Sequence, residues 1–208
     1  MAAWQEKYRK PVVVDECGYE GDIHLGWGDL SAEELLMRFW RGFTLGGYVG
    51  HGETYVNEQE ELWWSKGGQL KGQSAPRIAF LRKIFEQTPE LRAVKKPDPE
   101  EIDLMDPAAQ QAALSPGGVK NLESLMAQEA WGADAVGIDA HGETCLFYFG
   151  MRQPGGRRFD LPTHQSYRID VIDTWNMTLD TAAEAACGET WVKLPGKKFI
   201  ALRIQRNP

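Results

Sequence analysis

The sequence predicts an α+β protein in which two βα units precede an antiparallel β-sandwich. In residues 1–88, short apolar runs alternate with helical patterns, which is the order of βα units. Residues 131–208 hold several short segments in which apolar and polar residues alternate between turns, as in a sandwich. Between them, residues 89–130 contain five prolines among scattered charges, which predicts a linker with short helices.

The first βα unit follows a short helical segment at residues 4–9. Three consecutive valines in residues 10–16 predict a parallel strand that is buried on both faces. After a glycine-rich loop, Ser31 and Glu34 form a capping box that begins a helix. The apolar stripe of this helix consists of Leu35, Leu36, Phe39 and Phe43.

The second unit begins after Gly46 and Gly47, with a short apolar strand at residues 48–51. A long loop leads from there to a helix that begins near Ser74, where a serine precedes a proline. The apolar stripe of this helix consists of Ile78, Leu81, Ile84 and Phe85.

Residues 131–208 contain the predicted sandwich strands. Residues 135–139 and 144–149 flank a polar turn, which predicts a hairpin. Apolar residues alternate with polar ones around 167–171 and again around 200–204. We therefore expect a separate antiparallel domain here.

Composition excludes several classes of function. The chain has 208 residues with 23 basic and 30 acidic side chains, a net charge of −7 that disfavours binding to a phosphate backbone. No apolar run is long enough to span a bilayer. The three cysteines are far apart and the four histidines lack close ligand spacing, so we expect no metal or cofactor. Eight tryptophans and 22 glycines fit a carbohydrate site, and fit a β-rich core equally well.

The first residues lack the apolar stretch of a signal peptide, which favours a cytoplasmic protein. A truncated start would have lost any such peptide, so the localisation stays open.

Glu16 is the main candidate for chemistry, because it ends a strand of the buried parallel type. Active sites of β/α proteins are built at that edge of the sheet, on the loops after the strands. A carboxylate there can act as a nucleophile or as a general acid/base. It can also simply hydrogen-bond to a neighbouring loop.

Several segments in order resemble the retaining glycoside hydrolases of clan A, which are (β/α)8 barrels. Residues 10–16 (KPVVVDE) resemble the seventh barrel strand, 46–54 (GGYVGHGET) the eighth, and 62–68 (LWWSKGG) the loop after it. Residues 148–150 and 167–177 resemble the C-terminal β-domain of a bacterial subgroup known mostly as domains of unknown function. The resemblance implies a partial barrel, its last two βα units, joined to an antiparallel β-sandwich.

The resemblance implies that Glu16 is the nucleophile of a double displacement. The acid/base of this family ends the fourth strand, usually as Asn-Glu, and only about nine residues precede the seventh strand here. Asn57 and Glu58 follow the eighth strand, so they do not replace it. We expect an incomplete catalytic apparatus in this chain.

Further residues of the same rim are candidates for sugar binding. Glu53 can bind a sugar hydroxyl and His51 a hydroxyl or a carboxylate, or both can tie the glycine-rich loop together. Trp63 and Trp64 can offer one ring to a sugar and one to the core. His24 can line the pocket or lie in a solvated loop.

Two functions follow as alternatives. The chain is the C-terminal part of a glycoside hydrolase, inactive alone, or a non-catalytic carbohydrate-binding or structural module. Two βα units cannot close an eight-stranded barrel. We therefore expect a partner chain that carries the remaining strands, or self-association through the open edge.

Overall fold

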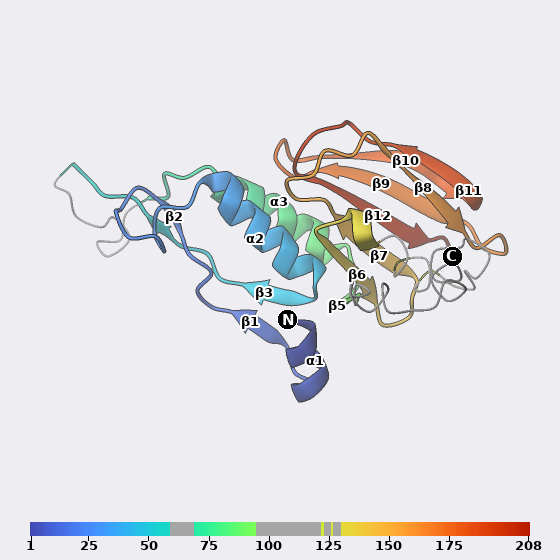
Figure 1. Ribbon diagram of the computed structural model, residues 1–208, viewed down its shortest axis with the longest axis horizontal. Helices are drawn as coiled ribbons and strands as arrows, with labels where there is room; N and C mark the ends of the chain where they lie inside the picture. The colour runs from blue at the N-terminus through green and yellow to red at the C-terminus, as the bar shows by residue number, and fades with distance from the viewer. Residues whose placement is uncertain (59–68, 95–121, 123–125, 127–129) are drawn as a thin grey trace, which may run out of the picture.

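A computed structural model describes residues 1–58, 69–94, 122, 126 and 130–208 of the chain (Figure 1). The protein is α+β, with many strands and few helices. The tryptophans Trp63 and Trp64 lie outside the described residues.

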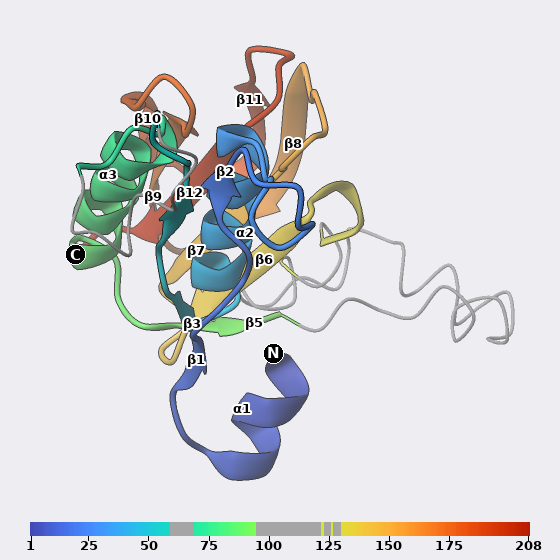
Figure 2. The same ribbon diagram turned by 90° about the vertical axis from the view of Figure 1, so that its left-hand side faces the viewer.

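The N-terminal half has the predicted order of strands and helices. Its elements are α1 (Ala2–Tyr8), β1 (Val12–Val14), β2 (Glu20–Gly21), α2 (Ala32–Thr44), β3 (Gly47–Val49), β4 (Glu53–Thr54) and α3 (Ser74–Glu86). β1 pairs with β3 and β2 pairs with β4, both in parallel. The carboxyl ends of β1 and β3 therefore point the same way, and the pair lies side by side in Figure 2.

The C-terminal half is built on one large sheet. Its elements are β5 (Leu91–Ala93), the 3-10 helix η3 (Ala130–Gly132), β6 (Ala135–Asp139), β7 (Thr144–Tyr148), β8 (Gly156–Leu161), β9 (Tyr167–Asp173), β10 (Thr178–Ala186), β11 (Gly188–Lys193) and β12 (Ile200–Arg206). Six strands form an antiparallel sheet in the order β10-β9-β12-β7-β6-β5. β8 and β11 form a separate antiparallel pair, the β8–β11 pair.

Both faces of the six-stranded sheet are buried along its inner strands, such as β6 and β7, whereas the edge strand β10 is mostly exposed. Along β7, Cys145 and Phe147 enter a core that also holds Phe159 of β8 and Val192 of β11. Leu146 and Tyr148 enter a second core, shared with residues of α2 and α3. The sheet therefore separates the two helices from the β8–β11 pair, as Figures 1 and 2 show.

The helix signals at Ser31 and Gly46 act as predicted, whereas Glu34 does not complete the capping box. The Ser31 hydroxyl accepts a hydrogen bond from the Glu34 backbone N–H at 3.1 Å. The Glu34 carboxylate pairs with Arg38 at 2.6 Å, so the capping box is not reciprocal. α2 ends where Gly46 adopts a positive φ of 74°, a conformation that favours glycine.

Two segments differ from expectation. Val13 in the middle of β1 is 61% exposed, so the prediction that this strand is buried on both faces is wrong. Among the described residues β1 pairs only with β3, and this face has no covering layer. Residues 91–93, which fall within the predicted linker, form β5 and pair with β6 at the edge of the sheet.

A buried ion pair joins the sheet to the end of α3. Arg203 of β12 donates to the Asp170 carboxylate of β9 at 2.8 and 3.2 Å, and its other Nη lies 3.4 Å from the Thr88 hydroxyl. Arg168 and Thr181 donate to the second Asp170 oxygen, each at 3.0 Å. Burial alone would raise the pKa of Asp170, but these hydrogen bonds outweigh it and hold the pKa below its ordinary value.

Asp170→Asn should lower the free energy of unfolding by about 3–5 kcal/mol, because it leaves the Arg203 guanidinium buried without its counter-charge. Denaturant unfolding at neutral pH measures this change. The matched control is Glu189→Gln, which breaks the exposed Arg158–Glu189 pair and should cost less than about 1 kcal/mol. Equal losses in the two variants would contradict the role given to the buried pair.

Candidate functional site

The parallel pair β1 and β3 brings two predicted residues to one edge. Glu16 follows β1 and His51 follows β3, each two residues beyond its strand. The Gly50 N–H donates to the Val14 carbonyl at 2.9 Å and so extends the pairing beyond the strands. A Cβ on Gly50 would lie 2.5 Å from the Asp15 carbonyl oxygen, so only glycine permits this close approach.

A pocket of about 780 Å³ opens at this edge. Its lining residues are Glu16, Tyr19, Trp27, His51, Gly52, Glu53 and Thr54. This volume lies within the usual range of small-molecule sites. The structure therefore brings together three residues that the sequence predicted: Glu16, His51 and Glu53.

Two aromatic side chains shape the pocket beside Glu16. The rings of Tyr19 and Trp27 meet edge to face, with centroids 6.0 Å apart. The Tyr19 hydroxyl lies within hydrogen-bonding reach of the Glu16 carboxylate. Burial, and then this contact with Glu16, raise the pKa of Tyr19, so the hydroxyl keeps its proton and can donate a hydrogen bond to Glu16.

The residue after Glu16 is held by α2. The Arg38 guanidinium donates to the Cys17 carbonyl, and it pairs with Glu34 one turn earlier on the same helix. Burial raises the pKa of the Cys17 thiol, which disfavours the thiolate that a nucleophilic cysteine needs. The pKa of Cys17 therefore gives no support to a cysteine nucleophile at this position.

Two buried carboxylates fix the segment that leads into α3. Glu20 of β2 and Glu53 of β4 are register partners in the parallel pair. Glu20 accepts the backbone N–H groups of Gln73 and Ser74 at 2.8 and 2.9 Å. Glu53 accepts the two preceding amides, those of Lys71 and Gly72, at 2.8 and 3.1 Å through Oε2. Four successive N–H groups are thus bound by two side chains.

The Glu20 carboxylate stays charged in this setting. Burial would raise its pKa, but the hydrogen bonds from Ser74, Gln73 and Tyr55 lower it below the ordinary value. The Tyr55 hydroxyl donates to Glu20 at 3.0 Å. Burial, together with that hydrogen bond, raises the pKa of Tyr55 to about 12. Glu20 therefore provides a fixed negative charge at the N-terminus of α3, where the helix dipole favours it.

Glu53 has one oxygen left over. It is only 6% exposed, and its Oε1 has no hydrogen-bond partner among the described residues. A buried acceptor without a donor is costly. Glu53 thus holds the segment before α3, whereas its predicted role in binding a sugar hydroxyl stays a prediction.

The other predicted residues differ in placement. His51 is exposed, and its Nε2 lies 3.4 Å from the Ser74 hydroxyl. His24 is exposed in the loop after β2 and is not a lining residue of the pocket. Trp63 and Trp64 fall outside the described residues, so their predicted contacts with sugar stay predictions.

Sequence reasoning missed Tyr19 and Glu20. Tyr19 reaches Glu16 only because the loop folds back, with its N–H on the Trp27 carbonyl at 2.8 Å. Glu20 accepts hydrogen bonds from the backbone of Gln73 and Ser74, which follow it in the sequence by 53 and 54 residues. The one available signal was the glycine-rich loop after Glu16, which also contains Trp27.

In the part of the chain that the structure describes, no cluster of three or more His, Cys, Asp or Glu side chains is arranged to hold a metal ion. None of the helices in that same part is both long and apolar enough to cross a bilayer.

Comparisons with known proteins found one family model and several solved structures that are similar to this chain. A family described as a domain of unknown function (DUF5605) matches residues 131–205. A crystal structure from Bacteroides vulgatus, described as a "putative glycoside hydrolase", shares 25% identity over 99% of this chain with a TM-score of 0.71. A glycoside hydrolase family 5 structure from Bacteroides vulgatus shares 14% identity over 98% of the chain with a TM-score of 0.60. A third structure, described as a glycoside hydrolase, shares 10% over 94% with a TM-score of 0.53.

This chain spans 38%, 43% and 42% of the lengths of those three structures. These three structures are thus described as glycoside hydrolases, and the chain spans less than half the length of each. No curated protein gave a match.

Glu20→Gln should make stability less dependent on pH in the acid range. The pKa of Glu20 is lower in the folded state than in the unfolded state, so its stabilisation is present above the unfolded pKa. That stabilisation is lost as pH falls through the folded pKa. At neutral pH the variant should lose about 1–3 kcal/mol, since the amides of Gln73 and Ser74 lose a charged acceptor.

Urea unfolding between pH 3 and 7 measures both effects. Glu90→Gln is the control, because Glu90 is exposed. A Glu20→Gln curve that runs parallel to that of the wild type at every pH would refute the assignment.

Proposed function

We propose that this chain is the C-terminal part of a retaining glycoside hydrolase and that Glu16 is its nucleophile. The observation that carries the proposal is the position of Glu16, at the carboxyl end of a parallel strand and in a pocket with Tyr19 and Trp27. The likeness to structures described as glycoside hydrolases supports it.

The chemistry is a double displacement. A Glu16 oxygen attacks the anomeric carbon while the glycosidic C–O bond breaks, which leaves a covalent glycosyl-enzyme. The leaving oxygen takes a proton from a second carboxyl group about 5–5.5 Å from the first. That group, now a carboxylate, removes a proton from water, and the water oxygen displaces Glu16 and releases the sugar.

The neighbours of Glu16 have distinct roles in this proposal. The Tyr19 hydroxyl positions the carboxylate, and its raised pKa keeps it a donor. The indole of Trp27 offers an apolar face to a pyranose ring. Oε1 of Glu53 accepts from a sugar hydroxyl, and His51 contributes a second polar contact at the rim. Trp63, Trp64 and His24 stay candidates for further sugar contacts.

The acid/base belongs, in this proposal, to a segment beyond these 208 residues. β1 and β3 correspond to the seventh and eighth strands of a (β/α)8 barrel, and residues 1–88 to its last two units. Residues 89–130 connect these to an antiparallel domain at 131–208. The exposed side chains Val13 and Tyr48, which are register partners, lie where further barrel strands would cover them.

A second candidate is a carbohydrate-binding or structural module without catalysis. The observation that favours it is the Glu53 oxygen, since a buried acceptor beside aromatic rings can bind sugar without turnover. The two candidates differ in one measurement: an assembly completed with the remaining barrel strands hydrolyses glycosides in the first and only binds them in the second.

Glu16→Gln in that completed assembly should lower turnover of aryl glycosides by at least about 10⁴-fold, the scale seen when a nucleophile is removed. Glu58→Gln is the matched control, because Glu58 is exposed and follows β4; its turnover should equal that of the wild type. Unchanged turnover in Glu16→Gln would exclude the nucleophile assignment. Full hydrolysis by the 208-residue chain alone would show that the chain already contains an acid/base, and would contradict this part of the proposal.

The open face of β1 and β3 should mediate assembly. Val13→Glu places a charge on this face and should weaken association with a chain that carries the other strands, or with a second copy, by at least about tenfold. Sedimentation equilibrium measures the association. Met151→Glu is the control, because Met151 is 52% exposed in the C-terminal half. If the wild-type chain is strictly monomeric and binds no such partner, the proposal that this face mediates assembly is wrong.

A further inference from the structure

Trp191 of β11 has an unusual setting for a tryptophan. At 67% it is the most exposed large hydrophobic side chain in the part of the chain that the structure describes. Its neighbours along the strand, Thr190 and Val192, point the other way, and Val192 belongs to the core beneath the β8–β11 pair. The indole therefore stands on the outer surface of this pair.

One face of the indole is backed by a glycine. A Cβ built on Gly156 of β8 would lie 2.2, 2.8 and 2.9 Å from three atoms of the six-membered ring. The ring thus lies directly across the Gly156 backbone, a position that a larger residue would not permit. Its other face is open to solvent, so the ring is held as a flat platform.

Polar side chains surround this platform. Arg158 lies opposite Trp191 in the register of β8 and β11, and Asp160 lies opposite Glu189. All three polar residues are exposed, and Arg158 pairs with Glu189 at 2.6 Å. The surface beside the ring therefore offers both donors and acceptors, with its charges mostly paired.

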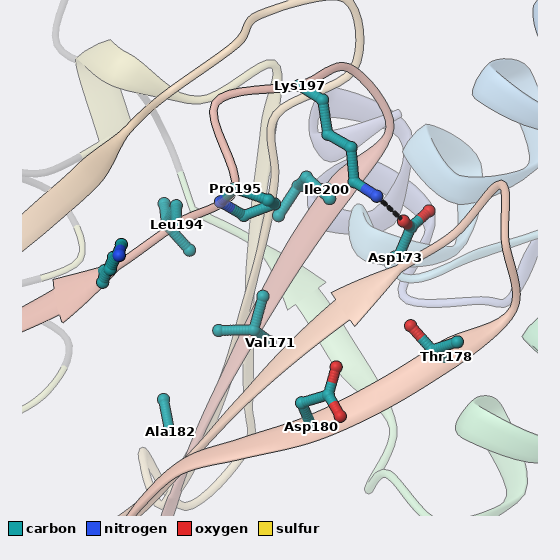
Figure 3. A pocket seen from close by; sticks show the side chains of 10 residues that line it. Val171, Asp173, Thr178, Asp180, Ala182, Leu194, Pro195, Lys197 and Ile200 are labelled. Carbon is teal, nitrogen blue, oxygen red and sulfur yellow. Dashed lines mark ion pairs between the residues drawn. The ribbon is translucent and has the colours of Figure 1, made fainter.

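A pocket lies near the end of the same strand. Lys193 is the next outward residue after Trp191 on β11, because side chains alternate along a strand. It also lines a pocket of about 340 Å³, shown in Figure 3. The pocket has apolar walls from Val171 and Leu194, the carboxylate of Asp180, and an ion pair between Asp173 and Lys197.

We propose that the β8–β11 pair is a second carbohydrate-binding surface, separate from the Glu16 pocket, which takes a neutral polysaccharide chain. A pyranose stacks its apolar C–H face on Trp191, since the negative face of the ring attracts polarised C–H bonds. A neighbouring sugar unit reaches the pocket beside Lys193. The ligand is neutral because the ion pairs Arg158–Glu189 and Asp173–Lys197 leave little net charge to attract an ionic one.

The choice of a carbohydrate as the ligand rests on the proposed function, whereas the exposed position of Trp191 is taken from the structure alone.

A protein partner fits this surface less well. Cores of protein interfaces are depleted of Lys, Glu and Asp, and here the exposed residues Asp160, Glu189 and Lys193 lie on the same face of the pair as Trp191. β8 and β11 both lie within the residues matched by the domain of unknown function, so the proposal assigns that region a role.

Affinity electrophoresis of the 208-residue chain tests the proposal, in native gels that contain mixed-linkage β-glucan, xylan, glucomannan or galactomannan. At least one of these should retard the wild type. Trp191→Ala should weaken that retardation by at least about tenfold. Trp4→Ala is the matched control, since Trp4 is 60% exposed on α1 and should leave retardation unchanged. Gly156→Val, which displaces the ring while keeping Trp191, should reproduce the loss.

A Trp27→Ala variant separates this surface from the Glu16 pocket. Retardation that survives Trp27→Ala and is lost in Trp191→Ala supports the proposal, whatever the fate of the catalytic assignment. Retardation lost in Trp27→Ala and kept in Trp191→Ala overturns it and leaves the proposed function intact. The proposal is also overturned if no gel retards the wild type, or if Trp191→Ala changes only the sedimentation mass. Unaltered melting of Trp191→Ala shows that the fold persists.

Discussion

The burial of the six-stranded sheet on both faces is the constraint on which the rest of the structure depends. Along β7 the side chains alternate between two cores, so each face must be covered by a separate layer. One layer is the β8–β11 pair, and the other is α2 with α3. On the helix side, Trp40 of α2 stacks on Tyr148 of β7 with ring centroids 5.9 Å apart. The helices are thus held by the sheet.

The candidate site inherits its geometry from that packing. α2 positions Cys17, and with it Glu16, through the Arg38 guanidinium. The start of α3 is bound by Glu20, and the residues before it by Glu53. The opposite end of α3 is bound to the sheet, where Arg203 meets Thr88. Loops that carry the pocket residues are therefore connected to the sheet through two helices, without lying on the sheet themselves.

Local sequence patterns predicted the elements whose packing is decided by their own periodicity. The stripe Leu35, Leu36 and Phe39 predicted α2, because these residues recur at helical spacing and face one core. The exposure of Val13 in β1 could not be predicted in this way. Three consecutive valines give the same sequence pattern whether or not another layer covers the strand. The same holds for the site. Glu16 stood out because it ends a strand, whereas the role of Glu20 depends on amides more than fifty residues away.

The sheet also decides how the two proposed sugar surfaces relate to each other. The Glu16 pocket belongs to the loops on the helix side, and Trp191 stands on the outer surface of the pair that covers the opposite face. In Figure 1 the loops around β2 and the strand β11 lie at opposite ends of the molecule.

If both surfaces bind sugar as proposed, a short oligosaccharide would occupy them independently, because no described element links them directly. A polymer long enough to reach both makes its second contact at a raised effective concentration. The benefit of Trp191 to a catalytic site would then appear with polysaccharides and vanish with small aryl glycosides. That dependence on substrate length combines the two proposals with the architecture, in which a sheet stands between the platform and the pocket.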